Sequence, residues 1–267
     1  MKQPRLTFLK LGGSLITDKG TTCTANLEVI QKICFEIASA IRENPDLSLV
    51  IGHGSGSFGH AIAHQYQTQM GGTDSSYWQG FSEVWSAARE LNQIMIRNLV
   101  SAGLPVIAFP PSAGVIAENK IFKTWDTQPI RVALSHNLIP VVQGDVVFDT
   151  QIGGTIFSTE KVFQHLTDKL SPDRILLAGS DPGVYHSLGQ SAKIAPLITP
   201  ENIIDVLPGL SGAKDIDVTG GMLAKVELML SLVKNHPDLK VQIFSGLTPG
   251  NIQKALAGAK LGTEISR

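Results

Sequence analysis

The chain has 267 residues, of which 43% are hydrophobic and 17% charged, and its net charge is −1. This length allows one large domain or two small ones, and the lack of any basic block argues against a nucleic-acid or anionic-membrane surface. No run approaches the roughly 18 apolar residues of a membrane span, and Cys23 and Cys34 fit neither a metal site nor a disulfide framework, so we expect a cytoplasmic protein with reduced thiols.

The first half of the chain alternates apolar strands with glycine-rich turns and helices. Apolar residues spaced three and four apart predict helices, and short apolar runs that end in glycines or prolines predict strands. The predicted strands are 5–11, 49–51, 105–109 and 139–142, and the predicted helices are 26–42, 60–66 and 81–99. This order of elements favours an α/β protein with a mostly parallel sheet.

The second half of the chain also alternates strands and helices, apart from one predicted hairpin. Residues 146–157 are predicted to form a hairpin that projects from the main sheet, with Gly153 and Gly154 in its turn. The predicted helices are 161–170, a short one capped by Thr199, 222–234, and one capped by Thr248; the predicted strands are 174–178, 240–244 and 262–265. No linker or shift in composition divides the chain, so we expect one continuous domain over 1–267, with two lobes meeting near residue 172.

The stretch LVIGHGSGSFGH, residues 49–60, has the pattern of a phosphate cradle. Its glycines allow close approach of the backbone to a ligand, and a helix starting there would direct its positive end at the same point. The spacing Gly54-x-Gly56-x-x-Gly59 also matches a dinucleotide fingerprint. That interpretation is weaker, because the loop follows the second strand and Asp74, at the expected distance, does not follow an apolar run.

Other predicted strand ends carry glycines with a cation or an acid. Each has an ordinary explanation as well: Lys10 could face water from an edge strand, and the others could be surface turns or a capped helix. The residues concerned are Lys10 with Gly12, Gly13 and Ser14; Lys19; Asp181 to Gly183; and 217–222 with Lys225. Because strand ends of a parallel sheet meet at one edge, the set together predicts a site for phosphoryl transfer.

Five motifs resemble the amino acid kinase superfamily and, within it, the isopentenyl phosphate kinases. They are LKLGGSLITDK (9–19), HGSGSFGH (53–60), QGDVVFD (143–149), SDPGVY (180–185) and DVTGGMLAK (217–225). The resemblance implies a three-layer α/β/α sandwich around a mostly parallel sheet. It also implies an acceptor-binding lobe at about 1–171 and a nucleotide-binding lobe at about 172–267. The implied cofactors are ATP and Mg²⁺, and the implied partners are a second copy of the chain in a homodimer, with no nucleic acid and no membrane.

The resemblance also implies residue roles in the ATP-dependent phosphorylation of isopentenyl phosphate. The catalytic residues would be His60, Lys19 and Lys10. The substrate would lie at Gly54, His60 and Gly153. Tyr77 and Phe81 could line the pocket for its hydrocarbon tail, although plain core packing is the better explanation for either one alone. The ATP site would comprise Lys10, Gly12, Gly13, Ser14, Ser55, Asp181, Gly183, Gly221 and Lys225, with no protein metal ligand.

Two departures from the family pattern stand out. Ser55 occupies a position where members often have glycine. Residues 158–161 read Ser-Thr-Glu-Lys where many members have Ser-Gly-Asp-Asp, so Glu160 is expected to be the acidic residue that orients the lysines. The alternatives are a kinase of another small phosphate or a phosphonate such as fosfomycin, and a non-catalytic nucleotide sensor; His60 disfavours a carboxylate or carbamate acceptor.

Overall fold

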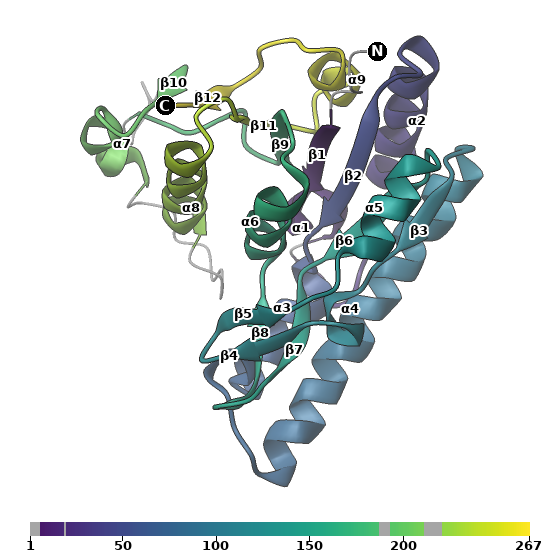
Figure 1. The fold of residues 1–267 in the computed structure, drawn as a ribbon, viewed down its shortest axis with the longest axis vertical. Helices are drawn as coiled ribbons and strands as arrows, with labels where there is room; N and C mark the ends of the chain where they lie inside the picture. The colour runs from purple at the N-terminus through teal and green to yellow at the C-terminus, as the bar shows by residue number, and fades with distance from the viewer. Residues whose placement is uncertain (1–5, 19, 187–192, 211–220) are drawn as a thin grey trace.

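The computed structural model describes residues 6–18, 20–186, 193–210 and 221–267 (Figure 1). Its main sheet has eight strands in the order β10-β12-β11-β9-β1-β2-β6-β3. The strands are β1 (Leu6–Leu11), β2 (Ser48–His53), β3 (Val106–Ala108), β6 (Ile139–Gln143), β9 (Arg174–Gly179), β10 (Leu197–Ile198), β11 (Lys240–Ser245) and β12 (Thr263–Ile265). Neighbouring strands of this sheet pair in parallel except for β11 with β12, which confirms the prediction of a mostly parallel sheet.

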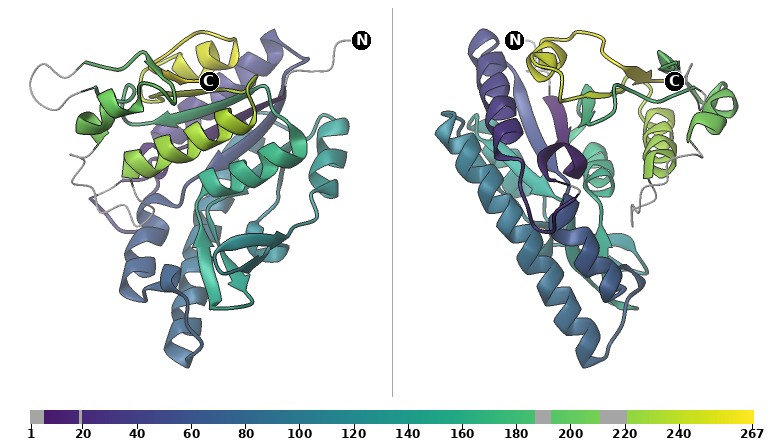
Figure 2. Two further views of the ribbon diagram at one scale, coloured as in Figure 1. Left: turned by 60° about the vertical axis from the view of Figure 1, so that its left-hand side comes forward. Right: turned by 180° about the vertical axis from the view of Figure 1, so that it is seen from behind.

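Helices cover both faces of this sheet. Figures 1 and 2 show α2 (Leu27–Glu43) and α4 (Ser75–Ser101) on one face, with α6 (Thr159–Leu170) and α8 (Gly221–Asn235) on the other. Within β1, Phe8 packs into the core beneath α6 and α8, whereas Leu9 packs into the core beneath α2 and α4. Because successive side chains of a strand point to opposite faces of the sheet, one strand contributes to both cores. Burial of a side chain such as Leu9 stabilises the fold by about 2 kcal/mol. The three-layer sandwich is confirmed.

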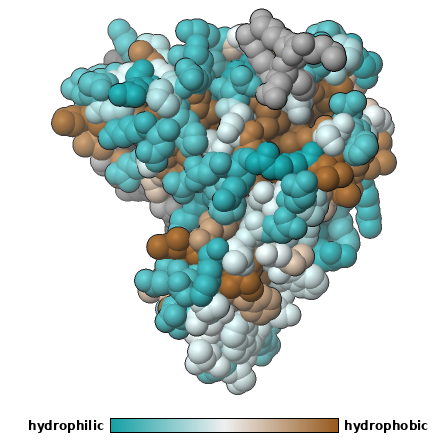
Figure 3. Space-filling view, viewed as in Figure 1, coloured by the Kyte–Doolittle hydropathy of each residue, from teal (hydrophilic) through white to brown (hydrophobic). Residues whose placement is uncertain are grey.

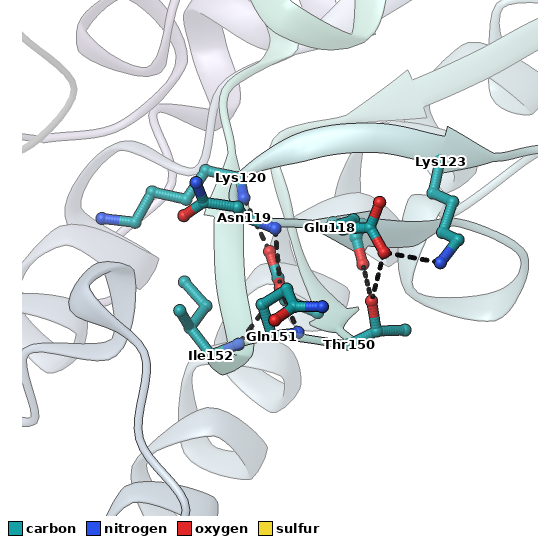
Figure 4. Close-up of polar contacts among 9 residues, drawn as sticks. Glu118, Asn119, Lys120, Lys123, Thr150, Gln151 and Ile152 are labelled. Carbon is teal, nitrogen blue, oxygen red and sulfur yellow. Dashed lines mark hydrogen bonds and ion pairs between the residues drawn. The ribbon is translucent and has the colours of Figure 1, made fainter.

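The predicted hairpin belongs to a second, smaller sheet with the order β5-β4-β7-β8. Its strands are β4 (Ile116–Glu118), β5 (Ile121–Thr124), β7 (Asp145–Asp149) and β8 (Gly153–Phe157). The prediction that Gly153 and Gly154 form the turn is wrong, because both begin β8 and the turn comprises residues 150–152. The Asp149 carboxylate fixes that turn by accepting hydrogen bonds from the amides of Gln151 and Ile152 (Figure 4).

Several predicted helix ends are shifted in the structure. α4 begins at Ser75 rather than at residue 81, because the Asp74 carboxylate caps it by accepting from the Tyr77 amide at 3.0 Å. α3 (Gly56–Gln65) begins within the glycine loop itself. α7 (Ile203–Leu210) begins later than Thr199 predicts, and Gly250, not Thr248, caps α9 (Asn251–Leu256). The remaining helices are α1 (Gly13–Ile16) and α5 (Gln128–Ser135).

No helix among the described residues combines the length and the apolar character that crossing a membrane requires. The 27-residue α4 is the longest, and it is amphipathic: Leu91, Met95 and Leu99 are buried against the sheet, whereas Glu90 and Arg97 are not.

Candidate active site

The carboxyl ends of β1, β2 and β9 open into a cleft with a volume of about 910 Å³. Ligands of parallel sheets bind at this edge because the loops that follow the strands converge there. The cleft brings together most of the predicted site residues: Lys10, Gly12, Gly13, Ser14, Gly54, Ser55, His60, Asp181, Gly221 and Lys225. Segments far apart in the sequence therefore form one continuous wall, as the several motifs together predicted.

The two glycine loops of the cleft lie directly against each other. A Cβ atom on Gly13 would come within 2.5 Å of the Gly56 nitrogen, and one on Gly54 would come within 2.9 Å of the Gly13 nitrogen. Gly56 also has a φ of +49°, and a Cβ there would come 2.1 Å from the hydroxyl of Thr17. Glycine is therefore required at these positions by backbone contact and conformation, and the contact places the amides of both loops at one point.

Ser55 is accommodated without strain. Its φ of −85° lies in the ordinary helical region, and it stands at the N-cap of α3. A Cβ on Gly59 would come 2.7 Å from the Ser55 hydroxyl oxygen, so Gly59 leaves the room that the serine side chain occupies. The start of α3 thus keeps its amides directed at the cleft, with His60 one turn along the same helix. The positive end of the helix favours an anion there.

Lys10 lies in the interior of the main sheet, since β1 pairs with β2 on one side and β9 on the other. Lys10 is only 9% exposed, so it does not face water from an edge strand, which was the ordinary explanation for this lysine. The Lys10 ammonium donates to the carboxylate of Glu160 in the first turn of α6. Burial alone would raise the pKa of Glu160, but the charges of Lys10 and Lys225 hold that pKa well below its usual range. Glu160 therefore pairs with Lys10, one of the lysines that the family resemblance implied it would orient.

Asp145 is a second buried acid at the cleft that the sequence analysis did not select. Its carboxylate accepts from the amide of Ser112 at 3.1 Å and from its neighbour Val146 at 3.0 Å. Burial nevertheless raises the pKa of Asp145 to about 6. The signal available in the sequence was its place immediately after the predicted strand 139–142 and Gly144.

His53, at the other end of the glycine loop from His60, does not line the cleft. Its side chain is buried, with Nδ1 3.1 Å from the carbonyl oxygen of Gly54 and Nε2 3.0 Å from the side-chain nitrogen of Asn92. These contacts suit a neutral imidazole that donates to the carbonyl and accepts from the amide. Burial lowers the pKa of His53 to about 4. His53 thus links the glycine loop to α4 through these two hydrogen bonds.

Four predicted site residues lie outside the cleft wall, and one cannot be placed. Tyr77 and Phe81 are buried in an apolar cluster behind Ala63 and Val84, which do line the cleft. Gly153 packs against Gly72, and Gly183 packs against Ile194 and Thr263. Lys19 lies outside the described residues. The aromatic pair therefore supports the cleft wall from behind in this structure.

Protein ligands for a metal ion are sparse around the cleft. In the described ranges, no group of three or more histidine, cysteine or acidic side chains could hold one. Among the described residues, the carboxylates that line the cleft are Asp145, Glu160 and Asp181, of which Glu160 is already paired with Lys10. Mg²⁺ commonly binds through substrate phosphates and only one or two carboxylates, so this donor set fits a metal that enters with a nucleotide.

Comparison with known proteins agrees with the geometry. The pattern of the amino acid kinase family matches residues 5–245. Isopentenyl phosphate kinase of Methanocaldococcus jannaschii is 35% identical over 266 residues, covering 97% of this chain and 98% of that protein. The enzyme of the same name from Methanothermobacter thermautotrophicus is 32% identical, with the same coverage of each chain. A solved structure of an isopentenyl phosphate kinase superposes with a TM-score of 0.83 at 28% identity, covering 98% of this chain and all of that one.

Proposed function

This chain belongs to the amino acid kinase family, and we propose that it transfers the γ-phosphoryl group of ATP to isopentenyl phosphate, giving isopentenyl diphosphate and ADP. One observation carries the proposal: a single cleft holds two sets of anion-binding groups. Lys10 and Lys225 lie with the first glycine loop, whereas His60 and the start of α3 lie with the second. Two anions must meet in such a cleft, and its relatives of full length carry the corresponding name.

The proposed chemistry depends on positioning rather than on a strong base. A phosphate oxygen of the acceptor attacks the γ-phosphorus of ATP, and the bond from that phosphorus to the bridging oxygen of ADP breaks. The nucleophile needs little activation, because the second pKa of a phosphate monoester is about 6. The obstacle is repulsion between the two anions, which Lys10, Lys225, Lys19 and the loop amides would offset. Each well-placed donor can contribute about 3 kcal/mol in the transition state.

Mg²⁺ would accompany ATP in this proposal. Bound to the nucleotide phosphates, it would neutralise part of their charge. Asp181 lines the nucleotide side of the cleft and is exposed, so it is available to such an ion directly or through water. Glu160 would instead hold Lys10 in place.

Acceptor choice would rest on His60 and on the apolar wall beside it. A ring nitrogen of His60 can donate to a phosphate oxygen, and Ala63, Val84 and Ile156 offer an apolar surface to a hydrocarbon tail. Tyr77 and Phe81 pack behind that surface and would fix its depth. Gly153 and Gly183 would act in the same indirect way, through the packing of their segments.

Two further parts of the proposal concern the whole protein. We propose a homodimer in the cytoplasm. Hydrophobic residues reach the surface in patches on the face shown in Figure 3, and Phe35, Ile121 and Ile204 are among the exposed large apolar side chains. Surfaces of this kind favour association. Sedimentation velocity would test the dimer.

ADP release with Mg-ATP and a panel of acceptors tests the function. The panel comprises isopentenyl phosphate, dimethylallyl phosphate, fosfomycin, UMP and acetylglutamate. We expect kcat/KM to be highest for isopentenyl phosphate and negligible for acetylglutamate, because the latter brings a carboxylate to His60. A higher kcat/KM with fosfomycin or UMP would replace the proposed acceptor, and ATP binding without turnover of any acceptor would favour a nucleotide sensor.

A further inference from the structure

Lys161 is a cation of the cleft to which neither the sequence motifs nor the proposed mechanism assigns a role. It lines the cleft at the third position of α6, one residue beyond Glu160. Its ammonium lies 5.5 Å from the centroid of the Phe157 ring, which also lines the cleft. The half-buried side chain is thus held against the wall of the cleft rather than extended into solvent.

The position is unfavourable for a positive charge in the absence of a ligand. Burial and the neighbouring charge of Lys120 lower the pKa of Lys161. The first turn of a helix also repels a cation, because the helix dipole is positive there. Among the described side chains, no carboxylate pairs with Lys161 or Lys120, and Glu160 is engaged by Lys10.

Lys120, whose charge acts on Lys161, is positioned by the small sheet. It lies in the turn between β4 and β5, where its amide donates to the Asp149 carboxylate at 2.7 Å. Figure 4 shows the side chains of Lys120 and Lys123 extending in opposite directions from this hairpin. Lys123 pairs with Glu118 at 2.6 Å, whereas Lys120 extends away from that pair. Lys161 at the cleft and Lys120 beside it carry like charges, and an anion bound at this point of the cleft would compensate both.

The surroundings of α6 indicate which of the two proposed anions, donor or acceptor, would compensate the charge of Lys161. α6 packs against α8 in a shared core, and the carboxylate of Glu160 senses both Lys10 and Lys225. The first turn of α6 therefore faces the side of the cleft where the donor phosphates are proposed to lie. His60 and the acceptor loop belong to α3.

We propose that Lys161, with Lys120 behind it, forms an additional phosphate subsite for the donor nucleotide. This inference rests on the proposed function for the identity of the donor. An ammonium at this point would contact the phosphate chain of ATP and fix its path past Phe157. Loss of one charge-assisted contact of this kind corresponds to about a tenfold loss of affinity.

The test compares Lys161→Ala, Lys161→Arg and Lys120→Ala with the matched control Lys123→Ala from the same hairpin. For Lys161→Ala we expect the KM for ATP to rise about tenfold, with a smaller rise for Lys120→Ala. The KM for isopentenyl phosphate should stay within about twofold, Lys161→Arg should retain most of the ATP affinity because it keeps the charge, and Lys123→Ala should resemble the wild type. Thermal unfolding of each variant establishes that it is folded.

Calorimetric titration of ATP without any acceptor keeps this test separate from the proposed function. A roughly tenfold weaker Kd for Lys161→Ala supports the subsite even if isopentenyl phosphate proves to be the wrong acceptor. An unchanged Kd for ATP in Lys161→Ala overturns the inference. A rise in the acceptor KM in place of the ATP KM overturns it as well, since the subsite would then serve the other anion.

Discussion

At the scale of single residues, His60 carries acceptor choice in the proposed mechanism. It stands on α3 just beyond the loop amides and lines the cleft. His60→Ala should lower kcat/KM for isopentenyl phosphate by about 100-fold, the effect of losing one positioned donor. The Kd for ATP should change little, because the donor-side groups lie on other elements. Steady-state kinetics with both substrates and ATP calorimetry measure these quantities.

His64 provides the matched control for this prediction. It lies one turn further along the same helix, where it is exposed although it also lines the cleft. His64→Ala should reduce kcat/KM far less than His60→Ala does, while His60→Gln should recover part of the loss through its side-chain amide. Equal effects of the two alanine variants would show that the position of the imidazole at residue 60 does not matter.

His53 predicts a pH dependence of stability. Its pKa in the folded protein is about 4, lowered by burial, against an ordinary value of 6.5. As the pH falls from 7 to 4, His53 therefore becomes protonated in the unfolded chain but stays neutral in the folded protein. The free energy of unfolding declines over that pH range as a result. The wild type should lose about 3 kcal/mol more than His53→Gln between pH 7.5 and 4. Urea unfolding of both proteins at several pH values measures the difference.

The comparison with His53→Gln is needed because other groups titrate in the same range. Asp145 acts in the opposite sense: its pKa is raised to about 6, so its protonation below that value favours the folded state. Because both proteins contain Asp145, its contribution cancels in the difference between their free energies of unfolding. A direct NMR titration of the His53 ring in the wild type gives a second measurement, and a midpoint near 6.5 would contradict the assignment of a buried neutral imidazole.

At the scale of elements, Asp149 joins the two hairpins of the small sheet. Its carboxylate accepts from the amides of Asn119 and Lys120 in one turn and from those of Gln151 and Ile152 in the other, at 2.7 to 3.2 Å (Figure 4). Asp149→Ala leaves these amides without their acceptor and should destabilise the protein by about 3 kcal/mol. Amide exchange at 119–120 and 151–152 should accelerate most, as measured by hydrogen exchange with mass spectrometry.

Glu118 is the control for the small sheet. Its carboxylate makes an exposed ion pair with Lys123 on the same hairpin and accepts from the Thr150 hydroxyl of the other turn at 3.5 Å, whereas the amides of Gln151 and Ile152 donate to Asp149. An exposed ion pair of this kind contributes at most about 1 kcal/mol. Glu118→Ala should therefore leave the exchange at residues 151–152 close to that of the wild type. If Asp149→Ala behaved like Glu118→Ala, the carboxylate would not be what joins the two turns.

The elements also show which parts of the architecture the sequence could predict. Strands of the main sheet and the long helices were predictable because burial imposes apolar runs or helical spacing on them. Strands β4 and β5 were missed because they are three and four residues long and meet at Asn119-Lys120, which lacks the glycine of a common two-residue hairpin turn. The hairpin turn at 150–152 was misplaced because a side chain, that of Asp149, stabilises it without glycine.

The candidate site likewise has parts that the sequence could predict and parts that it could not. Glycines at 13, 54 and 56 and a lysine inside an apolar strand are local signals, so the cradle could be predicted. The ion pair between Lys10 and Glu160 joins residues 150 positions apart, and Lys161 acquires its place in the cleft only when β8 and α6 pack together. Pairings of this kind depend on the fold rather than on any short pattern, which is why only the resemblance to a family suggested a role for Glu160.

At the scale of the whole molecule, one sheet crosses the boundary between the proposed lobes. β1, near the start of the chain, pairs along its length with β9, which follows residue 172. Arg174 reinforces this crossing by donating to the Thr7 hydroxyl at 3.2 Å. Separating the lobes would break these hydrogen bonds and expose Phe8 and Ile175, which share one core. We therefore predict that the lobes unfold together.

The tryptophans allow a direct test of that prediction. All three of them, Trp78, Trp85 and Trp125, lie in the first 171 residues, so their fluorescence reports on the N-terminal lobe alone. Hydrogen exchange of the β11 amides reports on the C-terminal lobe. The urea midpoints from fluorescence and from loss of β11 protection should coincide, because a shared sheet and core make partial unfolding costly. Loss of β11 protection at a clearly lower urea concentration would mean that the C-terminal lobe opens independently, with β1 keeping only β2 as its partner.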